Sequence, residues 1–407
     1  MKNSFNTKYL HPFGFWGRKI IRANGVFLYD EDDKEYIDFT SSGNVVNIGY
    51  NHPRMKAIMS NQIEKLIFAP PWCKTIESES LVEQLSKIFP DELDSILRST
   101  TGSESVEIAM KLARWYTKKS RFMSFKHSWH GHTFGVLSIG NTEKVRDGFK
   151  PLLTDSTIID HPYLVKSSQG FDNDCENTLK QIESEFRSGI YAAFVTEGFV
   201  SCPGCLPLSN SFFVKLRKLC DVYNVALIFD EVGTGFGRTG KMFSYERSGI
   251  IPDIVCVAKG LGSGYSPIAA VITRKEISKD FIYFATYAWT PFACAVASEN
   301  IRIIVEENLS VNSEKLGAYA LEKLRTSLKD SLLVKDIRGL GLEMAIELRD
   351  EESYIKIIDT CLSKGLFLLG ADLPFTFLIM PPLSITKDIL DKGLEIIIDS
   401  INELTNI

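Results

Sequence analysis

Short apolar runs in the middle of the chain predict buried strands. Three of them are YAAFVT (191–196), VALIF (225–229) and DIVCVA (253–258). Each has the length of a strand that is buried on both faces, and each is too short for a core helix. An ionisable residue follows every run directly, namely Glu197, Asp230 and Lys259.

The placement of these three side chains suggests a site. Ligands of an open parallel sheet bind beyond the carboxyl ends of its strands. A polar residue also follows a strand when the chain merely leaves the core, so a single instance carries little weight. Three instances with opposite charges favour one site that contains Glu197, Asp230 and Lys259.

Apolar positions at helical spacing alternate with the strands. A helix from Thr100 to about Tyr116 is predicted by the spacing of Val106, Ala109, Met110 and Ala113. Further helices are predicted over 53–66, 175–186 and 211–223, and a further strand over 122–125. Near the amino terminus, 26–43 is typical of two strands joined by an acidic turn at Asp30–Asp33. The alternation in the middle of the chain predicts an α/β fold with a doubly wound, mostly parallel sheet.

The predicted helix near residue 100 begins with Gly102 and Ser103. A helix start offers free backbone N–H groups and the positive end of the helix dipole, which together suit an anion. A serine at this place is equally an ordinary N-cap, and the residues alone favour the cap.

Composition excludes several classes of protein. A chain of 407 residues with 44% apolar and 24% charged residues is typical of a two-domain soluble enzyme. A net charge of −5 argues against a nucleic-acid partner. The sequence contains no run of 18 apolar residues, which argues against a membrane partner. The eight cysteines are scattered, and the lone pair Cys202 and Cys205 lacks a second pair at metal spacing, so we expect a cytoplasmic protein without a bound metal.

The segment GFGRTG (235–240) matches the GxGxxG pattern of dinucleotide-binding folds, and an NAD-binding or non-catalytic protein is therefore one alternative. The context argues against it. Little helical pattern follows before Pro252, and the next strand ends in lysine rather than in an acidic residue. We interpret the segment as a glycine-rich loop that passes close to a ligand.

A lysine and a carboxylate at neighbouring strand ends suit one cofactor. Lysine forms a Schiff base with a carbonyl, and pyridoxal 5′-phosphate (PLP) is the aldehyde that proteins hold in this way. The PLP ring accepts electrons well only while its nitrogen is protonated, which requires a nearby carboxylate. We therefore predict that Lys259 carries PLP and that Asp230 faces the ring nitrogen, as the two catalytic residues.

Two segments carry a resemblance to a known family. DEVGTGFGRTGKMF (230–243) and PDIVCVAKGLGSGYSPIAAV (252–271) resemble the signature of the class III PLP-dependent aminotransferases of fold type I, and other segments extend the resemblance over nearly the whole chain. It implies a large PLP-binding domain at 49–295. It also implies a small α+β domain built from both termini, at 1–48 and 296–407.

The resemblance also implies roles for further residues. Gly102 and Ser103 fall where the family binds the PLP phosphate. Trp129 and Val232 would cover opposite faces of the ring, and Glu197 would complete the cofactor site. Thr286 would reach the phosphate of the neighbouring subunit, which implies a homodimer with active sites at the subunit interface.

The substrate pocket follows from the same comparison. Gly43, Asn44 and Trp72 fall where the family walls the substrate cavity, with Trp72 in an aromatic loop that often crosses the dimer interface. His130 is expected to make a structural hydrogen bond rather than to act as a base.

Two departures from the family pattern bear on the substrate. Leu378 stands where many members place an arginine that binds the α-carboxylate as a bidentate pair, and Cys202 stands where some place the glutamate that holds this arginine. We infer that the pocket does not recognise an α-amino acid in the usual manner. Arg18, Arg22 or a residue of the other subunit remain alternatives for that role.

These residues predict transfer of an amino group between an amine or amino acid and a carbonyl acceptor, with Lys259 moving the proton. A racemase, aminomutase or lyase of the same family is an alternative, because single-substrate reactions need no second keto acid. The segment SWHG (128–131) is similar to 2,2-dialkylglycine decarboxylase, a family member. A decarboxylating transaminase is disfavoured, however, because Gly43 and Leu378 replace that enzyme's glutamine and arginine.

Overall fold

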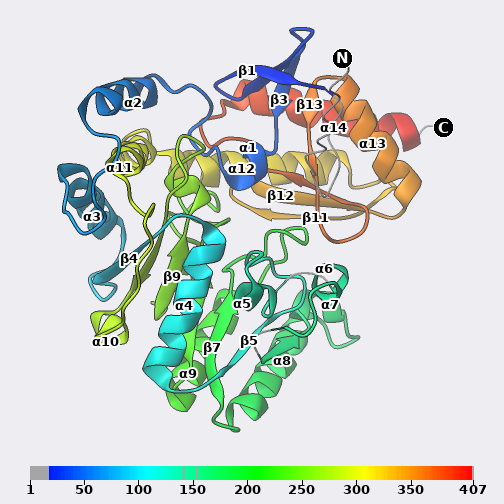
Figure 1. Cartoon of the computed structure of the whole chain (residues 1–407). Coiled ribbons are helices and arrows are strands. Elements are labelled where there is room, and N and C mark those ends of the chain that lie inside the picture. The colour runs from blue at the N-terminus through cyan, green and yellow to red at the C-terminus, as the bar shows by residue number, and fades with distance from the viewer. Residues whose placement is uncertain (1–17, 141–142, 153–154, 406–407) are drawn as a thin grey trace, which may run out of the picture.

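The computed structural model describes residues 18–140, 143–152 and 155–405, and its centre is a seven-stranded sheet (Figure 1). The strand order is β4-β10-β9-β8-β7-β5-β6, and β10 alone runs antiparallel to its neighbours. The bounds are β4 Ser95–Ser99, β5 Arg121–Phe125, β6 Ser156–Ile159, β7 Tyr191–Thr196, β8 Ala226–Asp230, β9 Ile254–Val257 and β10 Ala269–Thr273. The predicted α/β fold with a mostly parallel sheet is confirmed.

The three apolar runs form the centre of this sheet. They are β7, β8 and β9, which are neighbours and parallel, and every residue in them is buried. Successive side chains of β8 enter different cores: Ile228 packs with α4, whereas Leu227 and Phe229 pack with the core that contains α8 and α9. Both faces of the strand need apolar residues, and the run is therefore continuous rather than alternating.

Helices cover both faces of the sheet. The predicted helices are confirmed as α2 Pro53–Lys65, α4 Gly102–Thr117, α8 Phe171–Phe186 and α9 Asn210–Tyr223. The other helices of the large part are α3 Ile76–Ile88, α5 Phe134–Leu137, α6 Glu143–Asp147, α7 Pro162–Val165, the 3₁₀ turns η1 Ser244–Ser248 and η2 Lys259–Leu261, and α10 Lys275–Ser278. None of the described helices is both long enough and apolar enough to cross a membrane.

Two smaller sheets lie outside the large one, and the first of them combines strands from both ends of the chain. One has the order β1-β2-β3-β13, with β1 Ile20–Asn24, β2 Phe27–Asp30, β3 Glu35–Asp38 and β13 Leu366–Phe367. The other has the order β11-β12-β15-β14, with β11 Val334–Leu340, β12 Glu343–Leu348, β14 Leu369–Gly370 and β15 Thr376–Ile379. The remaining helices are α1 Ser41–Asn44, α11 Pro291–Glu306, α12 Leu309–Ser327, α13 Glu351–Ser363 and α14 Lys387–Thr405.

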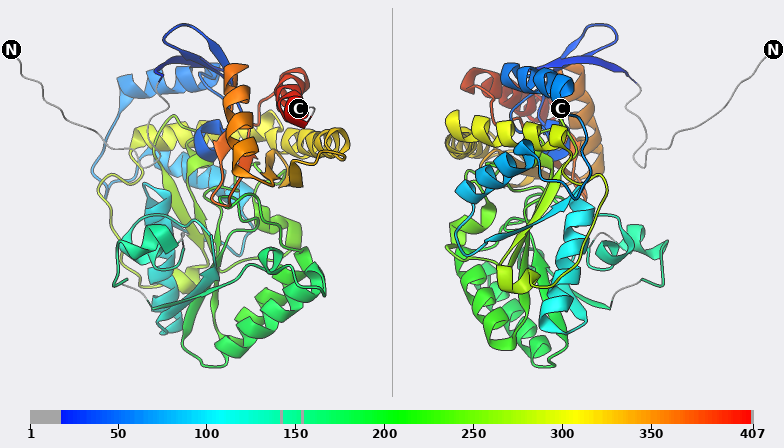
Figure 2. Two further views of the ribbon diagram at one scale, coloured as in Figure 1. Left: turned by 90° about the vertical axis from the view of Figure 1, so that its right-hand side faces the viewer. Right: turned by 60° about the vertical axis from the view of Figure 1, so that its left-hand side comes forward.

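The amino- and carboxyl-terminal segments lie side by side. β13 pairs in parallel with β3, and the two strands of the predicted hairpin, β2 and β3, pair across the acidic turn. Figure 2 shows from two further sides that these strands, α13 and α14 lie together over one end of the large sheet. The cavity described below is lined by residues of both parts.

The glycine-rich segment 235–240 consists of turns, and no helix opens at its end. The rejection of a dinucleotide-binding loop is thus supported. The interpretation as a loop close to a ligand is wrong, because none of these six residues lines the cavity described below. Arg238 instead projects into the protein interior and joins the large sheet to the terminal segments by hydrogen bonds to Leu342 and Pro381.

Candidate active site

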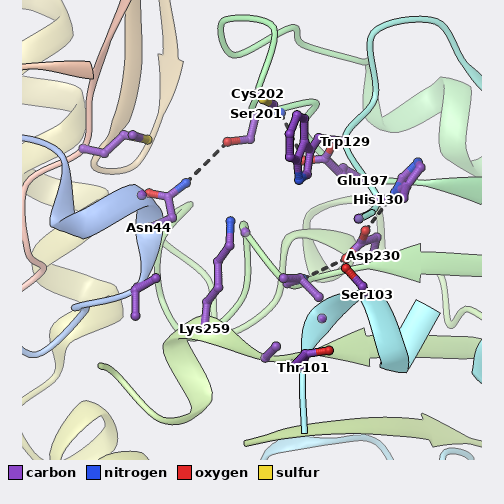
Figure 3. A pocket seen from close by; sticks show the side chains of 18 of the residues that line it. Asn44, Thr101, Ser103, Trp129, His130, Glu197, Ser201, Cys202, Asp230 and Lys259 are labelled. Carbon is purple, nitrogen blue, oxygen red and sulfur yellow. Dashed lines mark hydrogen bonds and ion pairs between the residues drawn. The ribbon is translucent and has the colours of Figure 1, made fainter. Parts of the chain in front are cut away.

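A cavity of about 820 Å³ lies where the three central strands end. Glu197, Asp230 and Lys259 all line it, so the structure brings the three strand-end residues together. Figure 3 shows the amine of Lys259 pointing into the space between Asn44 on one side and Asp230 on the other. The parallel register of β7, β8 and β9 is the cause, because it places the carboxyl ends of these strands at one edge.

Lys259 occupies a strained position. It begins the 3₁₀ turn η2 just after β9, and its backbone φ is +37°. A non-glycine residue in the left-handed region costs on the order of 1–3 kcal/mol and persists only where the surrounding structure enforces it. Such strain is concentrated at functional sites, and here it directs the amine into the cavity.

Asp230 is held in a fixed orientation. The residue is 2% exposed, and its Oδ1 accepts a hydrogen bond from the backbone N–H of Val232 at 3.0 Å. Its Oδ2 lies 2.8 Å from Nδ1 of His130, which is also buried. The expected structural hydrogen bond of His130 is therefore present, and it orients the carboxylate that faces the cavity.

Glu197 presents an unpaired oxygen. Its Oε2 accepts a hydrogen bond from the N–H of Ser201 at 3.1 Å, whereas Oε1 is buried and has no hydrogen-bond partner among the described residues. Burial, together with the nearby negative charge of Asp230, raises the pKa of Glu197 well above 4.5. A buried polar atom without a partner is costly, so a hydrogen bond to a bound molecule would stabilise this carboxyl group.

The start of α4 forms a cradle at the cavity. Its N-cap is Thr101, whose side chain accepts from the N–H of Glu104 at 3.2 Å, so the cap that the residues alone suggested for Ser103 is not present. Ser103 Oγ instead accepts from the N–H of His132 at 3.2 Å. A Cβ at Gly102 would lie 2.8 Å from Cγ1 of Val232, so only glycine leaves this space open. The free N–H groups of the helix start therefore face a space that fits an anion.

Trp129 and Val232 complete the cofactor half of the cavity, because both line it with apolar surface from different segments. The set consists of an amine, a fixed carboxylate, a helix start and two apolar walls. These groups match the aldehyde, the protonated ring nitrogen, the phosphate and the planar ring of PLP, so the residues present fit this cofactor.

The other half of the cavity is lined by Gly43, Asn44 and Leu378, as predicted from the sequence. Gly43 and Asn44 belong to α1, a turn in which all four residues have positive φ, from 45° to 76°. The Nδ2 of Asn44 donates to the carboxylate of Glu343 at 2.6 Å, and Ser201 Oγ donates to the same carboxylate oxygen.

Glu343 was missed by the sequence analysis. It is fully buried in β12, burial raises its pKa, and one of its oxygens has no partner among the described residues. Its signal in the sequence was a lone acidic residue at the start of the otherwise apolar run EMAI (343–346). Glu343 contacts the lining residues Asn44 and Ser201, and two residues that line the cavity themselves, Asp372 and Tyr354, were missed as well.

Two predicted residues lie outside this cavity. Trp72 is 79% exposed, and Thr286 is exposed beside the aromatic loop in a separate shallow depression. Phe68 and Tyr287 are in ring contact there, with centroids 5.4 Å apart. Within one chain, therefore, neither Trp72 nor Thr286 reaches the residues around Lys259.

Neither alternative arginine reaches the cavity within this chain. Arg18 pairs with Asp30 at 2.9 Å, and Arg22 pairs with Asp33 at 2.5 Å. Cys202, which stands where some family members have a glutamate, does line the cavity, and its thiol contacts Asp372 at 3.7 Å. Burial, with the nearby Asp372 carboxylate, raises the pKa of this thiol, which argues against a reactive thiolate.

Comparison with known proteins gives one consistent family. The family described as aminotransferase class-III matches residues 15–401. An acetylornithine aminotransferase of Bacillus cereus is 33% identical over 95% of this chain and 96% of that protein. An ornithine aminotransferase of Plasmodium falciparum is 32% identical over 93% of this chain and 90% of that protein.

Solved structures agree with these relatives. A transaminase from the marine bacterium Virgibacillus superposes with a TM-score of 0.91 at 28% identity, covering 98% of this chain and 97% of that one. A PLP-bound amine transaminase from an uncultivated Pseudomonas species has a TM-score of 0.91 at 26% identity, covering 97% and 98% of the two chains.

Proposed function

This chain belongs to the class III aminotransferases, which are PLP-dependent, and we propose that its amino donor is not held by an arginine–carboxylate pair. One observation carries the proposal. Leu378, 4% exposed, forms the cavity wall where many family members have arginine. Among the described lining residues, Lys259 is the only lysine or arginine, so nothing else from this chain would pair with an α-carboxylate.

The cofactor half of the cavity supports specific roles. When bound, PLP supplies a carbonyl that takes up the amine and a ring that accepts electrons. Lys259 would hold it through Nζ, and Asp230 would hold the proton on the ring nitrogen. Gly102 and Ser103 would donate backbone N–H groups to the phosphate. The resemblance assigns the ring faces to Trp129 and Val232 and a cofactor contact to Glu197.

The chemical step would depend on Lys259 and on the residues that orient it. Its Nζ, when free, is the group placed to take a proton from the amine-bearing carbon of the substrate and to return it. Asp230 stays oriented for its role because the Val232 N–H and His130 hold one carboxylate oxygen each.

A homodimer would bring Thr286 and the aromatic loop to a neighbouring cavity. In support, large apolar side chains are exposed around them, including Phe68, Trp72, Phe284 and Tyr287. Apolar patches of this kind mark association surfaces. The domain boundaries at residues 48 and 295 stay a prediction, as does the similarity to 2,2-dialkylglycine decarboxylase. A cytoplasmic location also stays a prediction, which the free state of all eight cysteines supports.

Amine donors offered to the holoenzyme without an acceptor test the proposed reaction. A transaminase loses the yellow absorbance of its cofactor under these conditions, whereas a racemase, aminomutase or lyase regains it. The donors include simple alkyl amines, α-amino acids, ornithine and N-acetylornithine. Lys259→Ala serves as the blank.

Leu378→Arg tests the role of the missing arginine. A charged hydrogen bond is worth about 1.5–3 kcal/mol, so kcat/KM for α-amino acid donors should rise by about 10- to 100-fold. Leu378→Met is the matched control, because it keeps volume and polarity. If the wild-type enzyme prefers α-amino acids and Leu378→Arg does not improve their use, the proposal is wrong.

A further inference from the structure

The cavity wall around Leu378 carries a carboxylate, Asp372. β14 and β15 pair through Leu369 and Leu378, and Asp372 follows β14 in the loop that joins these two strands. Backbone bonds fix this loop: the N–H of Asp372 donates to Cys202 O at 3.1 Å, and the N–H of Leu373 donates to Pro203 O at 3.3 Å. The Asp372 side chain is therefore held in the wall of the same cavity as Lys259.

The Asp372 carboxylate has weak partners. The Cys202 thiol contacts Oδ2 at 3.7 Å, and His127 contributes a Coulombic attraction. Within the described part of the chain, no lysine or arginine pairs with Asp372. Burial raises the pKa of this half-buried group. A carboxylate that is partly removed from water gains most from a cation that comes with the ligand.

The other carboxyl groups at the cavity also lack a lysine or arginine partner among the described residues of this chain. Asp230 is paired with His130, whereas Glu197 keeps a buried unpaired oxygen and Glu343 lies behind Asn44 and Ser201. A bound cofactor adds the negative charge of its phosphate and engages the lysine that would otherwise balance these groups. The substrate half of the cavity then contains the carboxylate of Asp372 and, behind Asn44, that of Glu343, and Lys259 is the only lysine or arginine among the described lining residues.

We propose that Asp372 binds a second ammonium group of the amino donor, so that the donor is a diamine or polyamine. This rests on the proposed function, in which no arginine grips a carboxylate. One amine would react at Lys259, and the other would lie at the wall near Asp372 and Leu378. Tyr354 lines the same wall, packed so closely on Gly370 that an added Cβ there would collide with its hydroxyl. Its oxygen is a second acceptor for an ammonium.

Three donors with the same five-carbon chain separate the possibilities. Cadaverine ends in an ammonium, pentylamine in a methyl and δ-aminovalerate in a carboxylate. With the holoenzyme and one keto acid acceptor, kcat/KM for cadaverine should exceed that for pentylamine by about tenfold or more, with δ-aminovalerate lowest.

Asp372→Asn keeps the shape and removes the charge. It should lower kcat/KM for cadaverine by about 10- to 100-fold, mainly through KM, and change that for pentylamine by less than about twofold. δ-Aminovalerate should improve. Asp359→Asn, on the exposed side of α13, removes the same charge outside the cavity and should leave all three donors unchanged.

The outcomes distinguish this inference from the proposed function. If no amine bleaches the cofactor absorbance, the proposed function fails. If pentylamine reacts as well as cadaverine, or Asp372→Asn affects both equally, the function stands and the inference is overturned. The order of kcat/KM values for the three donors is measured with the wild-type enzyme. It therefore tests the inference even if Asp372→Asn does not fold.

Discussion

Replacing Arg238 tests whether a buried guanidinium joins the parts of the chain that form the substrate half of the cavity. Arg238 is fully buried, and its two terminal nitrogens donate to four acceptors. These are Leu342 O at 3.0 Å, Pro381 O at 2.6 Å, Ser41 Oγ at 3.1 Å and Asn47 Oδ1 at 2.9 Å. The acceptors belong to three segments that are far apart in the sequence.

The structure sets the size of the effect of Arg238→Lys. Burial lowers the pKa of Arg238 to about 10, so the side chain stays charged at neutral pH. An ammonium has three N–H donors and lacks the guanidinium fork, so at least one of the four buried acceptors loses its donor. Each such loss costs about 1–3 kcal/mol. We expect a decrease of at least about 1–3 kcal/mol in the free energy of unfolding.

Urea unfolding at fixed protein and cofactor concentration measures this decrease. Lys241→Met is the matched control, because Lys241 is exposed in the adjoining segment and should leave the free energy within about 0.5 kcal/mol of wild type. Arg238→Lys should also raise KM for amine donors, since the lost bonds hold the segment that carries Asn44. An Arg238→Lys protein as stable as the Lys241→Met protein would refute the reasoning.

Two further predictions concern the cavity itself. Gly102→Ala should weaken cofactor affinity by about tenfold or more, because its Cβ would lie 2.8 Å from Val232 Cγ1 and overpacking costs about 1–3 kcal/mol. Cofactor titration checks this, with Gly148→Ala as control, since a Cβ there meets nothing within 4 Å. Glu343→Gln should change the pH dependence of stability, because burial raises the pKa of Glu343 above 4.5. The protonated Glu343 contributes its full stabilisation below pH 4.5, and this stabilisation is lost as the pH rises through the raised pKa. The free energy of unfolding of the wild type should therefore fall relative to that of the variant as the pH rises above 4.5. If the two free energies of unfolding change in parallel over this pH range, the assignment is contradicted.

The central sheet and its strand-end residues could be predicted because their signals are local. A strand buried on both faces must be apolar at every position, and YAAFVT and VALIF therefore stand out without any knowledge of their partners. Once the strands are parallel, the residues that follow them share one edge. Asp230 and Lys259 lie close together for this reason alone, because the parallel strand order brings them to one edge whatever the packing of other side chains.

The substrate half could not be predicted as far, because its residues meet only through long-range pairing. Asp372 lines the cavity because β14 pairs with β15, and Glu343 lies beside it because it accepts a hydrogen bond from Asn44 of α1. Arg238 lies in a segment whose glycines suggested proximity to a ligand, yet its acceptors are more than 100 residues away in both directions. No local pattern encodes these contacts. A lone acidic residue in an apolar strand does indicate, however, that a buried partner for it lies elsewhere in the chain.

Leu378 and Asp372 bear on substrate choice together. Loss of the arginine alone would leave an apolar wall that is indifferent to charge, and any amine of suitable shape would enter. A carboxylate beside that wall makes the pocket selective, because a negatively charged donor must approach Asp372 without a cation to offset the repulsion. Restoring arginine at 378 while Asp372 remains would let this carboxylate compete with the substrate for the new guanidinium, which reduces the gain but does not abolish it. The double variant Leu378→Arg/Asp372→Asn should therefore favour α-amino acids more than Leu378→Arg does, and strictly additive effects on kcat/KM would show that the two positions act independently.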